Sequence, residues 1–289
     1  MQPREPGRRV RSRDYRWSDR QGASPGASRK KIAALALALV SILALGGGLY
    51  VLSKRSYVPT DSETLCPTHQ PVAQLAVVIL DVSDQLTDLQ VLAIKNDFKR
   101  VQKSIPRLGR VEVYTLGDAA STDPRSFIQL CNPGSGEDLN GLYQNPELAR
   151  RRWETSFDAR LSQEIETLLR APADGQSPIY EAIQATVIRT LHRPEFDSIP
   201  KRLIIFSDLL HNVRGKQSHY QSAPDLESFK GSAYFRQLRT DMSGVDVDLY
   251  YIRRSAVHAQ GGKHIEFWNR YLSDQGANVR SVKSIEGDR

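Results

Sequence analysis

The chain has 289 residues, of which 39% are hydrophobic and 25% are charged, proportions that are ordinary for a globular protein. Its formal charge of +7 arises within residues 1–31, which contain ten Lys and Arg but three Asp and Glu. The rest of the chain is neutral in sum and lacks the bulk positive charge of a domain that binds DNA or RNA, so no nucleic-acid partner is expected.

The first 31 residues are rich in Arg, Ser, Gly and Pro and contain almost no aliphatic side chains. Such a segment buries too little apolar surface to offset the entropy lost on ordering, so we expect a disordered tail. Its charge has two interpretations, a nucleic-acid-binding arm or a tail that orients a membrane span. The segment that follows favours the second.

Residues 32–52 contain no charged side chain in 21 positions. A helix of this length spans about 31 Å, which matches the hydrocarbon core of a bilayer. The basic excess on its amino-terminal side predicts a single-pass membrane protein with a cytoplasmic amino terminus and an extracytoplasmic domain, periplasmic if the source is bacterial. The alternative is a cleaved signal peptide, whose apolar region is usually about 7–15 residues long. Residues 53–72 follow as a polar stalk.

From residue 73 to residue 289, apolar strands alternate with amphipathic helices, and we interpret this part as one domain. Strands separated by helices imply crossover connections, which predict an α/β fold with a Rossmann-like, mostly parallel sheet flanked by helices. We expect strands at 75–80, 110–116, 126–130, 202–206, 245–252 and 278–283, and helices at 88–105, 146–170, 178–192, 224–238 and 262–274.

The first strand, LAVVIL at 75–80, is an unbroken apolar run, which is typical of a strand buried on both faces of a sheet. It runs into Asp81 and Ser83, and Thr87 to Gln90 then has the pattern of a capping box that opens a helix. Ligands of open α/β sheets bind at the carboxyl edge, where Asp81 and Ser83 are expected.

Two further segments place similar side chains at the same edge. Ser207 and Asp208 end the apolar strand at 202–206, and Ser177 lies in a loop after Gly175 that turns directly into a helix. Carboxylate and hydroxyl oxygens are hard ligands that suit Mg²⁺, Ca²⁺ or Mn²⁺ better than zinc.

With these residues, the chain resembles the von Willebrand factor type A (vWA) family over about residues 73–285. Asp81 and Ser83 match the first and third positions of the family's D-x-S-x-S motif, and Gln85 takes the fifth. The family's second motif is a Thr in a loop-to-helix turn. Ser177, before Pro-Ile-Tyr-Glu, takes the place of this Thr. Asp208 matches the T/S-D-G motif, in which Leu209 replaces the Gly.

The resemblance implies a partly degenerate metal-ion-dependent adhesion site formed by Asp81, Ser83, Ser177 and Asp208. In such a site the hydroxyls touch Mg²⁺ or another divalent cation, the Asp residues act mainly through water, and one coordination position is left for a partner's carboxylate. The implied function is a protein-binding or scaffolding module that engages its partner at the top of the sheet. The alternative is a metal-free structural subunit of a membrane complex.

An enzyme is not expected, because the chain has no G-x-S-x-G, G-x-x-x-x-G-K-[ST] or H-E-x-x-H motif. A dehalogenase-type phosphotransferase would need a second Asp at Ser83, so a metal-dependent hydrolase or phosphatase is the least favoured alternative. His211 follows Asp208 closely, and we interpret it as a solvated loop residue, with a place in the lining of the site as the alternative.

Cys66 and Cys131 are the two cysteines of the chain, and the predicted topology places both in an oxidising compartment. We therefore expect a disulfide, with two buried free thiols as the alternative. The vWA resemblance agrees, because an antiparallel third strand would bring Cys131 to the edge at which the first strand begins.

Overall fold

The computed structural model describes residues 25–55, 58–121, 126–137, 139, 145–170, 175–254 and 256–287. The chain divides into two compact units, Met1–Tyr57 and Val58–Arg289. Most of the tail expected at residues 1–31 lies outside the described residues, and helix α1 (Pro25–Arg55) begins within its last part.

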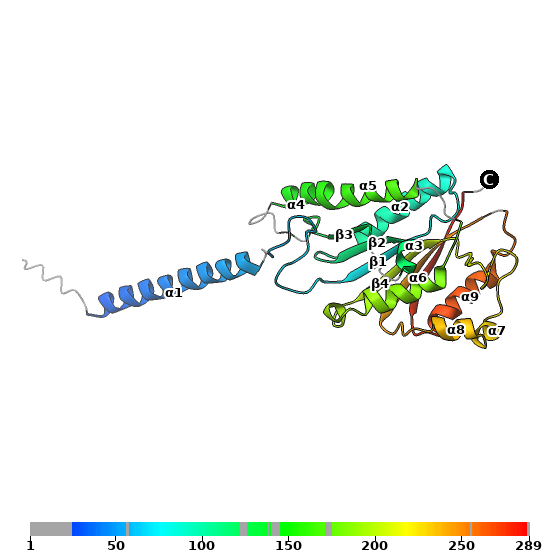
Figure 1. Cartoon of the computed structure of the whole chain (residues 1–289). Coiled ribbons are helices and arrows are strands. Elements are labelled where there is room, and N and C mark those ends of the chain that lie inside the picture. The colour runs from blue at the N-terminus through cyan, green and yellow to red at the C-terminus, as the bar shows by residue number, and fades with distance from the viewer. Residues whose placement is uncertain are drawn as a thin grey trace, which may run out of the picture. The chain divides into compact units, whose positions relative to one another are not determined.

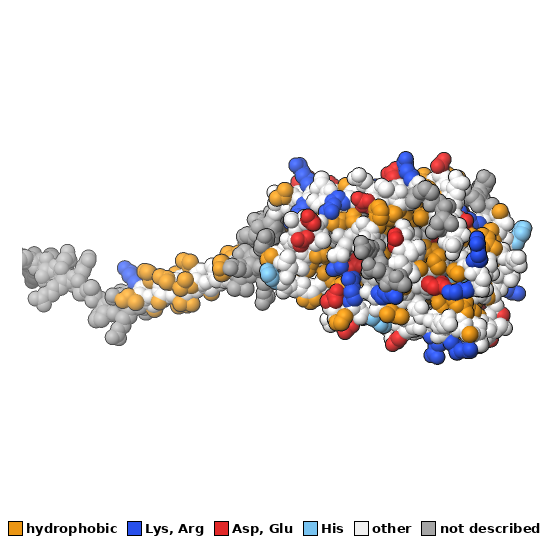
Figure 2. Space-filling view, in the orientation of Figure 1, with side chains coloured by type: hydrophobic (Ala, Val, Ile, Leu, Met, Phe, Trp, Pro, Cys, Tyr) orange, Lys and Arg blue, Asp and Glu red, His pale blue; other side chains and the backbone are white. Residues whose placement is uncertain are grey.

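Helix α1 carries the apolar segment of the first unit. Within the described residues, Lys31–Tyr50 is the one stretch long and apolar enough to cross a membrane. Hydrophobic side chains are exposed along the described part of this helix, as Figure 2 shows. A signal sequence would satisfy the same criteria, so permanent anchoring stays a prediction.

The second unit is built on a sheet in the order β3-β2-β1-β4-β5-β6. All neighbouring strands are parallel except β3, which is antiparallel to β2 at one edge. This confirms the predicted α/β fold, with the antiparallel third strand that the vWA resemblance implies, and it places β1 next to β4. The strands are β1 (Leu75–Leu80), β2 (Arg110–Thr115), β3 (Ile128–Cys131), β4 (Lys201–Ser207), β5 (Val245–Ile252) and β6 (Asn278–Ile285).

Helices cover both faces of this sheet (Figure 1). One face carries α2 (Asp88–Ser104), α4 (Pro146–Trp153) and α5 (Ala159–Leu169). The other carries α6 (Ile179–Thr186), α7 (Leu226–Lys230), α8 (Ala233–Leu238) and α9 (Gly262–Ser273). The short helix α3 (Leu116–Ala120) packs against α6.

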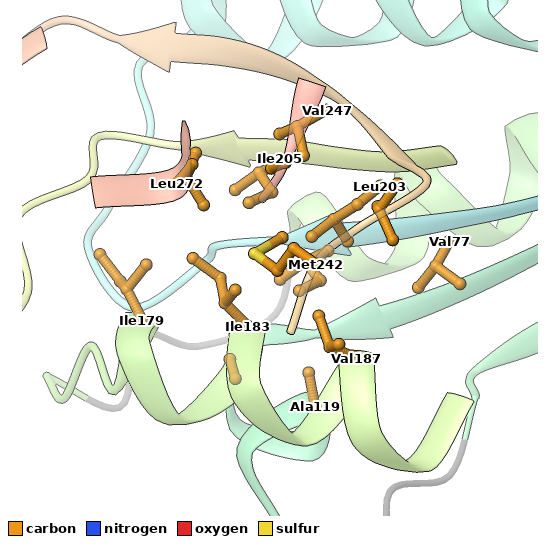
Figure 3. Packing of buried hydrophobic residues seen from close by; sticks show 14 of the residues in the cluster. Val77, Ala119, Ile179, Ile183, Val187, Leu203, Ile205, Met242, Val247 and Leu272 are labelled. Carbon is orange, nitrogen blue, oxygen red and sulfur yellow. The ribbon is translucent and has the colours of Figure 1, made fainter. Parts of the chain in front are cut away.

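The two layers explain why β1 is apolar throughout. Its alternate side chains Leu75, Val77 and Ile79 belong to the core on the α6 side, whereas Ala76, Val78 and Leu80 belong to the core on the α2 side. Figure 3 shows the α6 side, where Ile179, Ile183 and Val187 pack with Val77, Leu203 and Ile205 of the sheet. A central strand with two buried faces has no position for polar alternation.

Three helices and the end of one strand differ from the sequence prediction. The expected helix at 146–170 contains a π-helical segment, η1 (Glu154–Asp158), between α4 and α5, and the helix that starts with α6 ends in another, η2 (Val187–Leu191). The helix expected at 224–238 is two helices, because Ser232 caps α8 by accepting a hydrogen bond from the backbone N–H of Phe235. Leu116, expected in a strand, begins α3, which Thr115 caps.

The disulfide between Cys66 and Cys131 is formed, with the two Cα atoms 4.8 Å apart, as predicted. It ties β3 to the segment that precedes β1, and the backbone N–H of Cys131 donates to the carbonyl of Thr64 at 2.8 Å. Leu65 is buried in this segment. Residues 58–72, part of the expected stalk, therefore pack within the second unit.

A buried carboxylate lies in β2. Glu112 is 1% exposed and forms ion pairs with Arg110 and Arg193, each with a nitrogen–oxygen distance of 2.6 Å. The hydroxyl of Tyr114 donates to it as well, at 2.7 Å. Removing one member of such a buried network leaves the remaining charges without a partner.

Candidate functional site

The site begins where β1 and β4 end side by side. Leu80 is the register partner of Phe206, so Asp81 and Ser207 are the next residues at the carboxyl edge. The backbone N–H of Asp81 donates to the carbonyl of Phe206 at 2.8 Å. The Ser207 hydroxyl donates to Oδ2 of Asp81 at 2.6 Å. The strand register thus brings the ends of two motifs into direct contact.

Ser83 turns back onto Asp81. Its backbone N–H and its hydroxyl both donate to Oδ1 of Asp81, at 3.0 Å and 2.5 Å. The chain then enters α2 through the predicted capping box, in which Thr87 and Gln90 exchange both hydrogen bonds. This local geometry holds the hydroxyl of Ser83 at the edge of the sheet.

Ser177 reaches the same place from a distant loop. Its hydroxyl and that of Ser83 hydrogen-bond to each other, 2.5 Å apart. Gly175, with φ of +72°, lets the chain turn and donates its N–H to the carbonyl of Ser83 at 3.2 Å. Ser177 and Asn212 exchange two backbone hydrogen bonds, of 3.1 Å and 3.0 Å. Three of the four predicted site residues therefore form one hydrogen-bonded chain.

Asp208 is held from two sides. Its Oδ1 accepts the backbone N–H of Leu210 at 2.9 Å, and its Oδ2 accepts Nε of Arg254 at 2.9 Å. Its carbonyl accepts Nε2 of Gln260 at 2.8 Å. Sequence reasoning missed Arg254; the available signal was its place just after β5, a third parallel strand that ends at the same edge.

The site is buried, and its electrostatics follow from that. Asp81, Ser83, Ser177 and Asp208 are 3%, 4%, 2% and 1% exposed. Burial raises the pKa of Asp81, although the hydroxyls of Ser207 and Ser83 act against it. Burial, and then the nearby Asp81 carboxylate, raise the pKa of Asp208 to about 7, with Arg254 acting in the opposite direction.

Gln85 and Leu209 are the two residues that depart from the family motifs, and the structure places their side chains differently. The side chain of Gln85 is exposed, and the residue reaches the site through its carbonyl, which accepts a hydrogen bond from Nη1 of Arg254 at 2.5 Å. Leu209, in place of Gly, nevertheless adopts the left-handed conformation with φ of +57°, and its side chain is buried. For a residue with a Cβ this conformation costs about 1–2 kcal/mol.

The donor set fits a hard divalent cation in chemical type, since it consists of carboxylate and hydroxyl oxygens. Within the described part of the chain, no group of three or more His, Cys, Asp or Glu is placed to hold a metal. A cation at this edge would therefore depend on the hydroxyls of Ser83 and Ser177 as well as on Asp81 and Asp208.

A buried histidine cluster includes His211, which lies in the loop that follows Asp208. The interpretation of His211 as solvated is wrong: it is fully buried, packs on the Tyr180 ring and bonds the Tyr234 hydroxyl at 3.1 Å. His219 contacts the Tyr180 hydroxyl at 2.9 Å and His264 at 3.2 Å. Periodicity does not reveal the burial of His211 and His219, because both lie outside helices and strands and are buried by packing against remote segments.

Burial lowers the pKa of each of these imidazoles. The values fall to about 4 for His211, about 2 for His219 and about 4 for His264. For His211, nearby Glu181 acts against burial and Lys216 adds to it. The cluster is therefore neutral at pH 7.

No family model and no curated protein matches the sequence. Among solved structures, the chain is similar to the conserved hypothetical protein BatB from Bacteroides thetaiotaomicron, with 9% identity over 74% of this chain and 91% of that chain and a TM-score of 0.39. Proximal thread matrix protein 1 from the mussel byssus matches with 9% identity over 74% and 42%, and a TM-score of 0.35. An aerotolerance-related membrane protein from Bacteroides fragilis matches with 10% identity over 75% and 92%, and a TM-score of 0.33. Likeness at this level carries no argument about function.

Proposed function

We propose that this chain is a membrane-anchored, extracytoplasmic vWA-like module that binds a protein partner at the carboxyl edge of its sheet. The observation that carries the proposal is the buried hydrogen-bonded chain of Asp81, Ser83 and Ser177, which Ser207, the residue before Asp208, joins through Asp81. Burying two carboxylates at one edge costs free energy. A sheet end with a purely structural role does not require such buried carboxylates.

The membrane part of the proposal rests on α1 and on the disulfide. The apolar stretch Lys31–Tyr50 is long enough to span a bilayer, and the bond between Cys66 and Cys131 is typical of an oxidising, extracytoplasmic compartment. Protease added to intact cells or spheroplasts should digest the second unit and spare the amino-terminal tail. Release of a trimmed, soluble protein would instead indicate a cleaved signal sequence.

In this proposal Ser83 and Ser177 would hold Mg²⁺ or Mn²⁺ through their hydroxyls, and Asp81 and Asp208 would balance its charge. The bound cation would supply an open coordination position for a carboxylate of the partner. The residues of the chain orient the two hydroxyls, through the Asp81 contact and the paired backbones of Ser177 and Asn212.

A metal-free structural subunit is the second candidate, and Arg254 is the observation that favours it. Its guanidinium already neutralises Asp208, so the edge can exist without a metal ion. In that case the partner would contact the rim of the site, and its binding would not require a divalent cation.

A photo-crosslinking residue placed at Gln85 tests the binding surface in native membranes, because this side chain is exposed at the rim of the site. It should trap a specific partner, and Asp81→Asn should abolish the adduct. The matched control places the same crosslinker at Leu148, an exposed position on α4. Loss of the adduct with a chelator supports the metal-dependent form, and its survival supports the metal-free form. Equal adducts from Gln85 and Leu148, or an adduct indifferent to Asp81→Asn, would refute the proposed surface.

A further inference from the structure

The two buried carboxylates of the site have unequal partners. Asp81 is satisfied by neutral donors, the hydroxyls of Ser207 and Ser83 and the backbone N–H of Ser83. Asp208 accepts one backbone N–H and one guanidinium. Among the described contacts of these two carboxylates, Arg254 therefore supplies the cationic charge.

Arg254 bridges two of the loops that build the site. While Nε binds Asp208, Nη1 donates to the carbonyl of Gln85 at 2.5 Å and Nη2 donates to the carbonyl of Asp84 at 3.4 Å. Its side chain is 13% exposed. A guanidinium with three such acceptors is oriented by its planar fork of donors, as a lysine ammonium would not be.

The backbone at Arg254 is fixed as well. Its N–H donates to Oε1 of Gln260 at 2.5 Å, and the amide nitrogen of this buried Gln260 donates to the carbonyls of Asp208 and Ile252 at 2.8 Å and 2.9 Å. One side chain thus ties the start of the Arg254 loop to the residue whose carboxylate Arg254 neutralises.

A divalent cation at this edge needs the same negative charge that the guanidinium uses. With Arg254 in place, an incoming cation meets a positive group beside Asp208, and the low local dielectric makes that repulsion stronger than it would be in water. If Arg254 moves away, Asp84 and Gln85 lose a donor to their carbonyls, and the gap leaves two carboxylates without a counter-charge.

We propose that Arg254 is a built-in counter-ion of the Asp81–Asp208 pair and competes with divalent cations for the site. The proposal rests on the cation site of the proposed function and adds to it a side chain that keeps the site charge-balanced without metal. Divalent-cation binding then requires displacement of Arg254, and the affinity for the cation is set by this residue.

Equilibrium Mn²⁺ binding to the full chain in detergent tests this directly, with free Mn²⁺ measured by electron paramagnetic resonance. Arg254→Gln should bind Mn²⁺ with half-saturation at a concentration about tenfold lower than the wild type, the factor expected from removing one charge-assisted hydrogen bond. Asp208→Asn in the Arg254→Gln background should remove the added binding, which places the cation at this carboxylate.

Arg253→Gln is the matched control. It makes the same change of charge one residue away, where the guanidinium lies over the Tyr251 ring, 5.8 Å from its centroid. It should leave Mn²⁺ binding close to that of the wild type. Arg254→Lys keeps the charge and guards against a folding defect in Arg254→Gln; it should bind Mn²⁺ more weakly than Arg254→Gln.

Equal Mn²⁺ binding by the wild type and Arg254→Gln, whether both bind or neither does, would overturn the competition. An equal gain in Arg253→Gln would overturn it too, because the effect would then be one of overall charge. The crosslink from Gln85 is measured without added metal, so partner binding is judged separately. Its failure would refute the binding surface and leave the Mn²⁺ result to stand.

Discussion

Acid should destabilise the second unit through its three buried histidines. His211, His219 and His264 are fully buried, and burial lowers their pKa to about 4, 2 and 4, against about 6.5 in an unfolded chain. Below pH 6.5 the unfolded chain therefore takes up protons that the folded protein does not. The stability that neutral imidazoles provide is complete above pH 6.5 and is lost as the pH falls towards the folded pKa values.

The size of the effect follows from about 1.4 kcal/mol per pH unit for each group. At pH 5, each histidine lowers the free energy of unfolding by about 2 kcal/mol, and the three together lower it by about 6 kcal/mol. Asp208 acts in the opposite direction, because its folded pKa of about 7 lets the folded protein take up a proton as the pH falls below 7. This gain offsets roughly 2–3 kcal/mol by pH 5, and Asp81, whose pKa burial also raises, adds to the offset, so the net loss between pH 8 and pH 5 is at most roughly 3 kcal/mol.

Urea unfolding of the full chain in detergent, at pH 8, 7, 6 and 5 and with a chelator present, measures this loss. His219→Gln keeps hydrogen-bonding groups at the position but cannot take up a proton in this range, so it should reduce the histidine contribution by about a third. The exposed His258 gives the matched control, since His258→Gln removes a histidine without changing the buried cluster.

A pH dependence of the unfolding free energy in His219→Gln that equals that of the wild type would refute the reasoning, because it would show that protons bind elsewhere during unfolding.

Three further changes should alter the free energy of unfolding, measured by urea at pH 8. Replacing Cys66 and Cys131 with Ser opens a loop with a sequence separation of 65 and should cost about 4 kcal/mol by chain entropy; an unchanged midpoint after reduction of the wild type would contradict this. Glu112→Ala leaves two partly buried guanidinium groups without their carboxylate and should cost about 3–5 kcal/mol; a loss below about 1 kcal/mol would show that they find other partners. Leu209→Gly relieves left-handed strain but loses a buried side chain, for a net loss of roughly 1 kcal/mol; a stabilised variant would mean that strain dominates.

Local patterns predicted the fold class and much of the site. The run Leu75–Leu80 indicated a strand buried on both faces, and Thr87 to Gln90 indicated the cap that opens α2. Asp81 and Ser83 lie within a few residues of these features, so their contact depends on local geometry. The patterns succeed because burial on a strand face and capping at a helix end are set by neighbours in the sequence.

Tertiary packing alone placed Arg254 on Asp208, 46 residues away in the sequence. That contact depends on the pairing of β4 with β5 and on the loop that Gln260 holds. The burial of His211 likewise follows from packing against Tyr180, and no periodicity in its own loop signals it. A sequence pattern reports which side chains prefer burial, whereas the partner of a charged side chain is decided by strand register and loop packing between remote segments.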